Sequence, residues 1–295
     1  LPKPIEERID FKPPLSHIPR YLINSFISSS FGYRSPGGHT TPVDEIRDSN
    51  THCSYMFNFS TAEMNQIRNT IKKHVHDRCT MTPFLQAAWF VALYRSGKEF
   101  TRSIMEWTTD IVVAMNSRQL LPDDEDLLDS YKFGSNIAGT HYNYLISSFN
   151  VGEDKGKFWK LVGYYHDVFI KARGNNDFLY TMGMMMLDGF VNNKNIDLAV
   201  KTNALSSDRG GSILSNVGYF PLRNHGTDYK IQDLIFAQSP GALAFTYGIN
   251  VCSTDVSGMN FVMTVAKNAL NDRKDWEDLC ELFKETICRF CNILH

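Results

Sequence analysis

Residues 212–267 read SILSNVGYFPLRNHGTDYKIQDLIFAQSPGALAFTYGINVCSTDVSGMNFVMTVAK, which is a series of short apolar runs separated by turn-forming residues. The runs are rich in β-branched and aromatic side chains, and Gly, Pro, Asn, Asp or Ser bounds each of them. This composition is typical of β-strands joined by turns. We therefore expect four strands of a mostly antiparallel sheet, over residues 213–220, 229–238, 241–252 and 258–265.

Small polar residues stand in these strands where a fully apolar strand would carry Val or Ile. Ser215-Asn216 interrupts the first strand, and Ser253-Thr254-Asp255 follows the third. A buried hydroxyl or amide costs stability unless it finds a hydrogen-bond partner. From strand chemistry alone two interpretations stay open: these side chains satisfy neighbouring backbone, or they face a ligand.

Composition excludes several classes of protein. The chain has 295 residues and a formal net charge of −2, which argues against general electrostatic binding to nucleic acid. No run of 18 apolar residues is present, so we expect no spanning helix. The six irregularly spaced cysteines indicate reduced thiols in a cytosol-facing protein. Cys288 and Cys291 have metal-ligand spacing with His295 beyond them, but on an amphipathic helix we expect packed thiols and no metal.

The beginning of the chain has a different composition from the rest. Seven of the eleven prolines fall in residues 1–50, which predicts an extended crossover or linker, with the apolar residues 21–31 able to dock on a neighbouring domain. The chain starts Leu1-Pro2 without an initiator methionine or targeting pattern. We therefore expect a linker over residues 1–50, a lobe over residues 51–295, and a longer protein of which this is the C-terminal part.

The remaining elements follow from periodicity and end signals. Alternation predicts a strand over residues 53–59, and we also expect a buried strand over residues 110–115 and a strand over residues 142–149. Helical spacing predicts helices over residues 60–75, 82–96, 157–172, 178–191 and 275–294. Ser60 opens the first helix with a capping box, and Thr82 with Pro83 is expected to open the second. Gly97 is its expected stop.

The sequence contains no common catalytic motif. G-x-S-x-G, the Walker A loop, G-x-G-x-x-G and H-E-x-x-H do not occur. The nine histidines form no obvious catalytic set, and we expect His141 and His225 to lie in loops. Without a paired acid or nucleophile, each histidine is more readily explained by a structural role.

The order of several segments resembles the CoA-dependent acyltransferases of the chloramphenicol acetyltransferase-like superfamily, and most closely the fungal alcohol O-acetyltransferases. The resemblance lies in Thr80–Trp89, Asn116-Ser117-Arg118 with Leu121-Pro122, Tyr131–Asn136, Leu1–Ile5, Ile9–Phe11, Arg209–Gly211, Leu214–Gly218 and Asn250–Asn260. It covers essentially the whole chain. It implies an α/β fold with a mixed sheet and packed helices, which would be the C-terminal lobe of a two-lobed enzyme.

The central motif of that superfamily, H-x-x-x-D-G, does not occur in this sequence. The resemblance places this motif in the N-terminal half of the family, so we assign no catalytic residue in this chain. In the family the histidine of that motif acts as general base on the alcohol, whose oxygen then attacks the thioester of acetyl-CoA. An alcohol needs such a base because its pKa is far too high for ionisation at neutral pH.

The resemblance also gives hypotheses for individual residues. Ser215 and Asn216 are expected to line the tunnel in which CoA and alcohol meet, with Ser253 and Asp255 near its mouth. Asn116, Arg118 and Asn136 are expected to hold the interface between the lobes by buried hydrogen bonds.

The implied function is acetyl transfer from acetyl-CoA, a co-substrate rather than a resident cofactor, to small or branched alcohols and to sterols. N-acetylation of a long-chain amine and a non-catalytic lobe that binds lipid or a partner are the alternatives. The family implies peripheral association with endoplasmic reticulum or lipid droplets. The final helix has an acidic polar face, with Glu277, Asp278 and Glu281, so we expect it to pack on the core rather than on anionic lipid.

Overall fold

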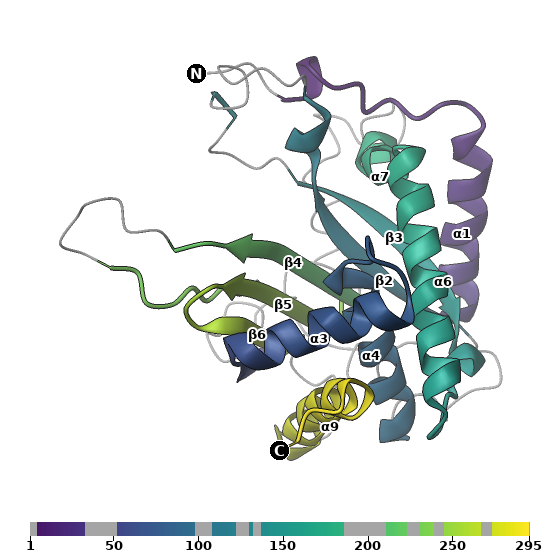
Figure 1. The fold of residues 1–295 in the computed structure, drawn as a ribbon. Coiled ribbons are helices and arrows are strands. Elements are labelled where there is room, and N and C mark those ends of the chain that lie inside the picture. Colours follow the sequence, from purple (N-terminus) through teal and green to yellow (C-terminus); the bar gives the residue numbers. More distant parts are fainter. Residues whose placement is uncertain are drawn as a thin grey trace.

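The fold is that of a computed structural model, which describes residues 5–32, 52–97, 108–121, 130–131, 137–185, 211–222, 230–238, 245–266 and 273–294. A six-stranded sheet forms its centre, and helices pack against it (Figure 1). This confirms the expected α/β class with a mixed sheet. Among the described residues, no helix is both long enough and apolar enough to cross a membrane.

The sheet has the strand order β1-β6-β5-β4-β2-β3. Its strands are β1 (His52–Phe59), β2 (Thr108–Asn116), β3 (Ile137–Leu145), β4 (Ser212–Phe220), β5 (Tyr247–Thr254) and β6 (Gly258–Ala266). The pairs β1–β6, β5–β6 and β2–β3 are antiparallel, whereas β2–β4 and β4–β5 are parallel. The expectation of a mostly antiparallel arrangement within residues 212–267 is therefore wrong for β4 and β5, since their carboxyl ends lie at the same edge.

The strand expected over residues 229–238 does not form. Residues 230–238 have no regular secondary structure, and Tyr229 lies outside the described residues. The carbonyl of Leu234 accepts hydrogen bonds from Cys252 Sγ at 2.9 Å and Asn260 Nδ2 at 2.9 Å, and that of Gln238 accepts from Thr264 Oγ1 at 3.0 Å. Side chains of β5 and β6 thus use these carbonyls, so the segment lies over the face of the sheet instead of adding a strand to it.

Helices α3 (Thr61–His74) and α4 (Met81–Ser96) follow β1. Ser60 caps α3 through the predicted capping box, and Gly97, in the left-handed region at φ +66°, ends α4 as predicted. The predicted N-cap of α4 is wrong by two residues, because Thr80 and not Thr82 occupies that position. The Thr82 hydroxyl instead accepts a hydrogen bond from Asn216 Nδ2 at 3.3 Å.

Aromatic side chains form the core between the helices and the sheet. Trp89 of α4 donates from Nε1 to Ser212 Oγ of β4 at 2.8 Å, and its ring meets Tyr247 of β5. Phe158 of α6 (Lys155–Gly174) stacks on Phe290 of α9 (Arg273–Cys291) with ring centroids 3.7 Å apart. Burial of each such ring contributes about 1.5–3 kcal/mol, so this layer fixes the helices on one face of the sheet.

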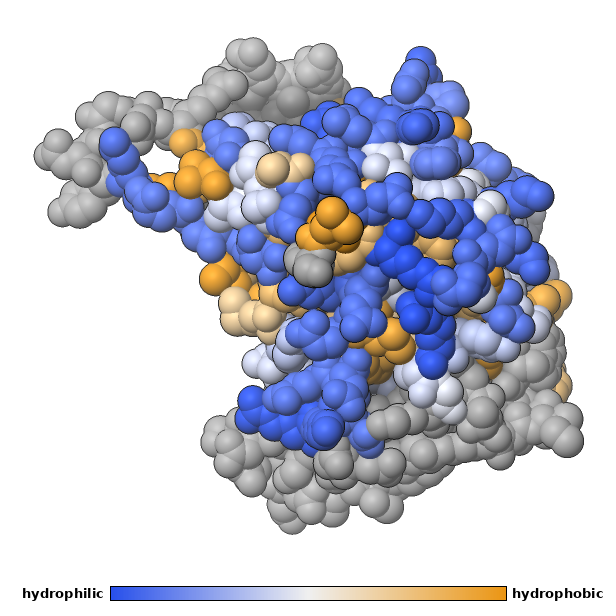
Figure 2. Space-filling model, turned by 60° about the horizontal axis from the view of Figure 1, so that its bottom comes forward, coloured by the Kyte–Doolittle hydropathy of each residue, from blue (hydrophilic) through white to orange (hydrophobic). Residues whose placement is uncertain are grey.

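The last helix packs on the core as expected. The apolar stripe of α9, which includes Trp276, Phe283 and Ile287, is buried. Figure 2 shows the side of the molecule brought forward from below, where polar residues cover most of the surface and apolar atoms form small separate patches. The apolar stripe of α9 is therefore occupied within this lobe.

The first fifty residues contain more structure than an extended linker. Residues Ile5–Glu7 form the short helix η1, and His17–Phe31 form α1, which contacts β2 and α7 (Asp177–Met185). Pro19 falls in the first turn of α1, where a missing backbone N–H breaks no helical hydrogen bond. The proline content alone predicted an extended segment where the structure has a 15-residue helix.

Two further boundaries differ from prediction. The strand predicted over residues 142–149 begins earlier, at Ile137, and ends at Leu145, after which η4 covers Ile146–Phe149. Within the predicted helix over residues 178–191, α7 spans Asp177–Met185, and the remainder lies outside the described residues. The short helix η3 (Ser117–Leu120) directly follows β2.

Candidate functional site

The parallel strands place the predicted polar residues toward the same end of the sheet, where the strands have their carboxyl ends. β2, β4 and β5 run in the same direction, and Asn116 is the last residue of β2. Ser215 and Asn216 lie at the middle of β4, and Ser253 lies near the end of β5. We call these residues, with Asp255 in the turn that follows β5, the strand-end cluster. The carboxyl ends of parallel strands are a common place for ligands in α/β sheets.

Ser215 and Asn216 point to opposite faces of β4, because successive side chains alternate along a strand. Asn216 lies on the side of α4, where Nδ2 donates to Thr82 Oγ1 at 3.3 Å and Oδ1 accepts from Gly218 N at 3.1 Å. Ser215, only 5% exposed, pairs in register with Asn250 on the other face. The two residues are therefore not neighbours on a single surface.

Ser253 and Asp255 also have different surroundings. Ser253 is buried in β5 opposite Tyr219 of β4. Asp255 is exposed, its Oδ1 accepts from the backbone N–H of Leu222 at 2.8 Å, and its carbonyl accepts from Thr61 Oγ1 at 3.2 Å. Asp255 thus joins the β5–β6 turn to the exit of β4 and the start of α3.

The face of the sheet that carries Ser215 holds a second group of polar side chains. Asn250 is fully buried, and its Nδ2 donates to the carbonyl of Val262 at 2.9 Å. Within the described part of the chain, Asn250 Oδ1 has no hydrogen-bond partner. Next to it, Asn260 Nδ2 lies 2.6 Å from Asp233 Oδ1. The pKa of Asp233 lies below its ordinary value, first because the Ser257 hydroxyl hydrogen-bonds to the carboxylate.

The structure describes the three residues expected at the lobe interface to different extents. Asn116 is exposed at the end of β2 and has an interaction partner within the chain. Arg118 lies in η3, where only its backbone is described, and Asn136 lies outside the described residues. Their role in an interface stays a prediction.

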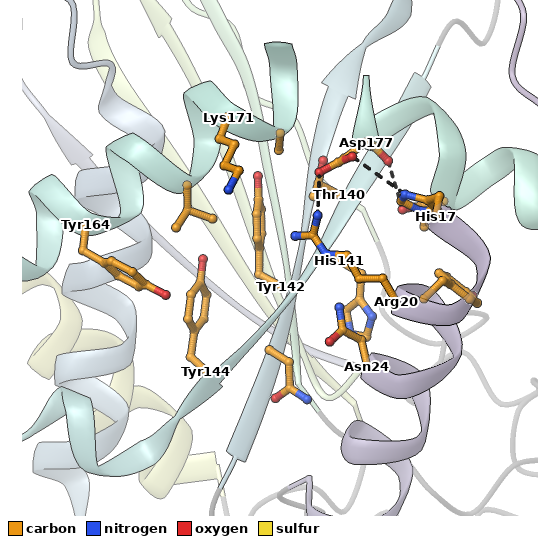
Figure 3. A pocket seen from close by; sticks show the side chains of 15 residues that line it. His17, Arg20, Asn24, Thr140, His141, Tyr142, Tyr144, Tyr164, Lys171 and Asp177 are labelled. Carbon is orange, nitrogen blue, oxygen red and sulfur yellow. Dashed lines mark hydrogen bonds and ion pairs between the residues drawn. The ribbon is translucent and has the colours of Figure 1, made fainter. Parts of the chain in front are cut away.

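A separate pocket lies beside β3, the edge strand, between α1 and α6 (Figure 3). Its volume is about 320 Å³. His141 lines it, and His141 Nε2 lies 2.8 Å from Asp110 Oδ2 of the neighbouring strand β2. The expectation that His141 lies in a loop is wrong, since β3 begins four residues before it. His225 lies outside the described residues.

Sequence analysis missed the His141–Asp110 pair because the two residues are 31 positions apart. Asp110 and Asn143 face each other across β2 and β3, and His141 lies one side-chain pair further along the same face. Only the register of the two strands brings imidazole and carboxylate together. Correct strand bounds together with the pairing register would have revealed this pair.

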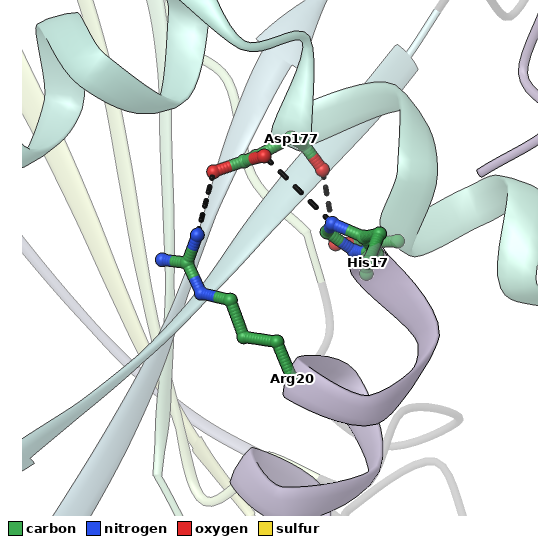
Figure 4. Close-up of polar contacts among 4 residues, drawn as sticks. His17, Arg20 and Asp177 are labelled. Carbon is green, nitrogen blue, oxygen red and sulfur yellow. Dashed lines mark hydrogen bonds and ion pairs between the residues drawn. The ribbon is translucent and has the colours of Figure 1, made fainter. Parts of the chain in front are cut away.

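Asp177 also lines the pocket, and Figure 4 shows its contacts with α1. Its Oδ2 lies 3.6 Å from Arg20 Nη1, and its Oδ1 lies 3.8 Å from His17 Nδ1. Burial lowers the pKa of His17, while Asp177 raises it and Arg20 lowers it to smaller extents. These contacts attach the first turns of α1 to the start of α7.

The sequence pattern of the alcohol acetyltransferase family matches residues 1–287. The chain belongs to the alcohol acetyltransferase family. It is 46% identical over 296 aligned residues to alcohol O-acetyltransferase 2 of Saccharomyces cerevisiae, and 36% identical over 286 to alcohol O-acetyltransferase 1 of the same yeast. These alignments cover 99% and 96% of this chain but 55% and 54% of the relatives. The chain therefore spans about half the length of the curated alcohol acetyltransferases that it matches.

Solved structures confirm the fold of this family member. The trichothecene 15-O-acetyltransferase TRI3 of Fusarium sporotrichioides superposes with a TM-score of 0.62 at 12% identity, over 92% of this chain and 51% of that one. The condensation domain of the Monacolin K polyketide synthase MokA gives a TM-score of 0.55 at 10% identity, over 94% and 59% of the two chains. The shared architecture is that of acyltransferase and condensation domains.

No metal centre is indicated in the described part of this alcohol acetyltransferase family chain. No group of three or more His, Cys, Asp or Glu residues there could hold a metal ion. Cys288 and Cys291 are buried in α9, and burial is the main cause that raises the pKa of Cys288 to about 11. A thiol is a poor metal ligand when its thiolate form is disfavoured. His295 lies outside the described residues.

Proposed function

We propose that the protein to which this chain belongs transfers the acetyl group of acetyl-CoA to an alcohol, and that this chain is its C-terminal lobe. The observation that carries the proposal is the family match over residues 1–287, together with two relatives named alcohol O-acetyltransferases. The strand-end cluster supports it, because small polar side chains lie there toward the carboxyl ends of parallel strands, where α/β sheets bind ligands.

The proposed reaction is a direct transfer. A general base takes the proton of the alcohol while its oxygen attacks the thioester carbonyl, and the tetrahedral intermediate collapses with loss of the CoA thiolate. We place that base on the part of the relatives that this chain does not cover. His141, the described histidine closest to a carboxylate, belongs to β3 and not to the strand-end cluster.

The strand-end cluster divides into two proposed roles. Ser215 lies on the same face as Asn250 Oδ1, a buried acceptor with no partner among the described residues, and we propose that this face lines the substrate tunnel. Asn216 and Asp255 hold α4, α3 and the strand ends together by the hydrogen bonds described above. They shape the tunnel mouth beside Ser253. Asn116, Arg118 and Asn136 are proposed to contact the other lobe.

The proposed acceptors are small or branched alcohols and sterols, and the proposed location is the cytosolic surface of endoplasmic reticulum or lipid droplets. Since the apolar stripe of α9 is buried, another surface must make the lipid contact. Leu22, Ile23 and Phe26 of α1 are exposed apolar side chains. Flotation with neutral-lipid droplets should fall when all three are changed to Ser; unchanged flotation would exclude α1.

The experiment measures acetyl-ester formation from acetyl-CoA and a medium-chain alcohol by the natural full-length protein and by this chain alone. We expect product only from the full-length protein. Activity in the 295-residue chain would place the base within it and overturn the split site. An amide formed from a long-chain amine in place of the ester would favour N-acetylation, and no product from either would favour a binding lobe.

Variants of the full-length protein test the residue roles. Ser215→Ala should lower kcat/KM at least about tenfold with little change in the unfolding temperature, because loss of a neutral hydrogen bond costs stability only about 1 kcal/mol. Ser148→Ala is the control, since Ser148 is exposed in η4, away from β4 and β5, and its hydroxyl donates to the carbonyl of Leu145. Equal losses of folded protein and activity would make Ser215 a structural residue.

A further inference from the structure

The pocket beside β3 contains buried polar groups that the fold leaves without partners. Tyr142 is only 7% exposed, and its hydroxyl has no hydrogen-bond partner within the described part of the chain. Both side-chain amide atoms of Asn143 are also buried and have no hydrogen-bond partner among the described residues. These two residues line the pocket from opposite faces of β3, so the pocket extends around the edge of that strand.

The neighbouring Thr140 hydroxyl interacts with the Tyr142 hydroxyl, but not within hydrogen-bond geometry. Thr140 also lines the pocket, but its Oγ1 is directed at Met115 Sδ, 3.6 Å away. Burial raises the pKa of Tyr142 to about 12, while Thr140 offsets a smaller part of that rise. The phenol therefore keeps its proton at neutral pH and remains a hydrogen-bond donor. A buried donor without an acceptor costs about 1–3 kcal/mol, which a ligand or an ordered water that reaches it can recover.

The rim of the pocket carries more positive than negative charge. Figure 3 shows Lys171 reaching from α6 toward the side of the pocket where the Tyr142 hydroxyl lies. No carboxylate of the described residues lies within ion-pair distance of Lys171, whereas Arg20 is held by Asp177 at 3.6 Å. His141 is held by Asp110. One ammonium group therefore faces the cavity without a counter-charge from the described residues.

We propose that this pocket binds a small organic anion, a carboxylate or a phosphate monoester, at a site separate from the acetyl-CoA tunnel. The anion lies between Lys171 and the Tyr142 hydroxyl, and the apolar part of the ligand packs on Tyr144 and Tyr164, which also line the pocket. A volume of about 320 Å³ corresponds to roughly ten water molecules, which is enough for a single aromatic or short aliphatic acid. A charge-assisted hydrogen bond explains the preference for an anion.

The test is calorimetric titration of the full-length protein with benzoate, phenyl phosphate and uncharged benzamide, with and without saturating CoA. We expect at least one of the two anions to bind at least about tenfold more tightly than benzamide, and CoA to leave this affinity unchanged. Lys171→Met should weaken anion binding about tenfold or more, since bonds to charged groups are the strong ones. The control is Lys160→Met, an exposed lysine of the same helix that does not line the pocket.

Tyr142→Phe separates a ligand-binding role from a structural one. Because the hydroxyl has no partner within hydrogen-bond geometry among the described residues, its loss should leave the unfolding temperature unchanged or higher while weakening anion binding about fivefold or more. Equal affinity for both anions and benzamide, or equal behaviour of Lys171→Met and Lys160→Met, would overturn the proposal. So would loss of anion binding in saturating CoA, because the pocket would then belong to the co-substrate site. These titrations need no turnover, so their outcome is independent of the proposed reaction.

Discussion

Gly258 opens β6 at the β5–β6 turn, and replacing it with Ala should destabilise the lobe strongly. Its φ is +86°, and an added Cβ would lie 2.1 Å from the carbonyl oxygen of Phe59, 2.5 Å from the carbonyl carbon of Ser60 and 2.7 Å from the nitrogen of Thr61. All three atoms are backbone at the junction of β1 and α3, and a Cβ in a real structure keeps at least 3.0 Å from such atoms. The junction must therefore move by about 1 Å in a close-packed region, where strain is transmitted rather than absorbed.

The expected loss has two parts. The left-handed conformation costs a residue with a Cβ about 1–2 kcal/mol, and displacing the β1–α3 junction adds about 2–3 kcal/mol, a typical cost of overpacking. Gly258→Ala should thus lower the free energy of unfolding by about 3–5 kcal/mol in urea denaturation. Such a value is at the large end of single substitutions.

Gly97→Ala is the matched control. Gly97 has a similar φ of +66°, but an added Cβ meets no heavy atom within 4 Å. It should lose only the conformational part, about 1–2 kcal/mol. The difference between the two variants isolates the contact with the β1–α3 junction. Equal shifts of their urea midpoints would refute the contact geometry of the β5–β6 turn.

Two other substitutions test contacts that position the strand-end cluster. Ser212→Ala leaves the buried indole N–H of Trp89 unpaired and should cost about 1–3 kcal/mol in urea unfolding, with Trp89→Phe completing a double-mutant cycle; a coupling energy near zero would contradict the 2.8 Å bond. Asp233 has a lowered pKa, so its stabilising effect is present above its ordinary value of 3.8 and is lost as pH falls through the lower folded value. The unfolding midpoint of Asp233→Asn should therefore depend less on pH than that of the natural protein between pH 5 and pH 3, and identical pH profiles would contradict this.

Local signals in the sequence predicted correctly those features that depend on residues of a single helix or strand. The capping box at Ser60 and the stop at Gly97 are set by residues within one helical turn, and both are confirmed. The apolar spacing of α9 and the alternation of β1 likewise predicted which face is buried. Such features depend on backbone geometry that a few neighbouring residues determine.

Predictions failed where a distant contact decided between local alternatives. Thr80 and Thr82 are both acceptable N-caps for α4, and the hydrogen bond between Asn216 and Thr82 engages the second hydroxyl elsewhere. Residues 230–238 have a strand-like composition, but side chains of β5 and β6 bind their carbonyls. No local pattern contains these partners, because they are between about 18 and 134 positions away.

The parallel pairing of β4 with β5 had the largest consequence for the site. In the parallel pair Ser215 and Asn216 lie beside Asn250 and Val251, and Ser253 follows further along the same direction beside Tyr219. The loop that separates the two strands is long enough for a crossover, since 26 residues lie between Phe220 and Tyr247.

Hydrogen-bonding capacity that the fold leaves unused distinguishes the groups suited to ligands from those that hold the fold. Asn216 and Asp255 use their side chains to join β4, α4 and the β5–β6 turn, so they are structural first. Asn250 Oδ1 and the Tyr142 hydroxyl are buried and have no partner among the described residues. An unpaired buried polar atom destabilises the folded chain unless water or a ligand reaches it. Asn250 Oδ1 lies on the proposed tunnel face and the Tyr142 hydroxyl in the pocket beside β3, so the two proposals concern separate sites.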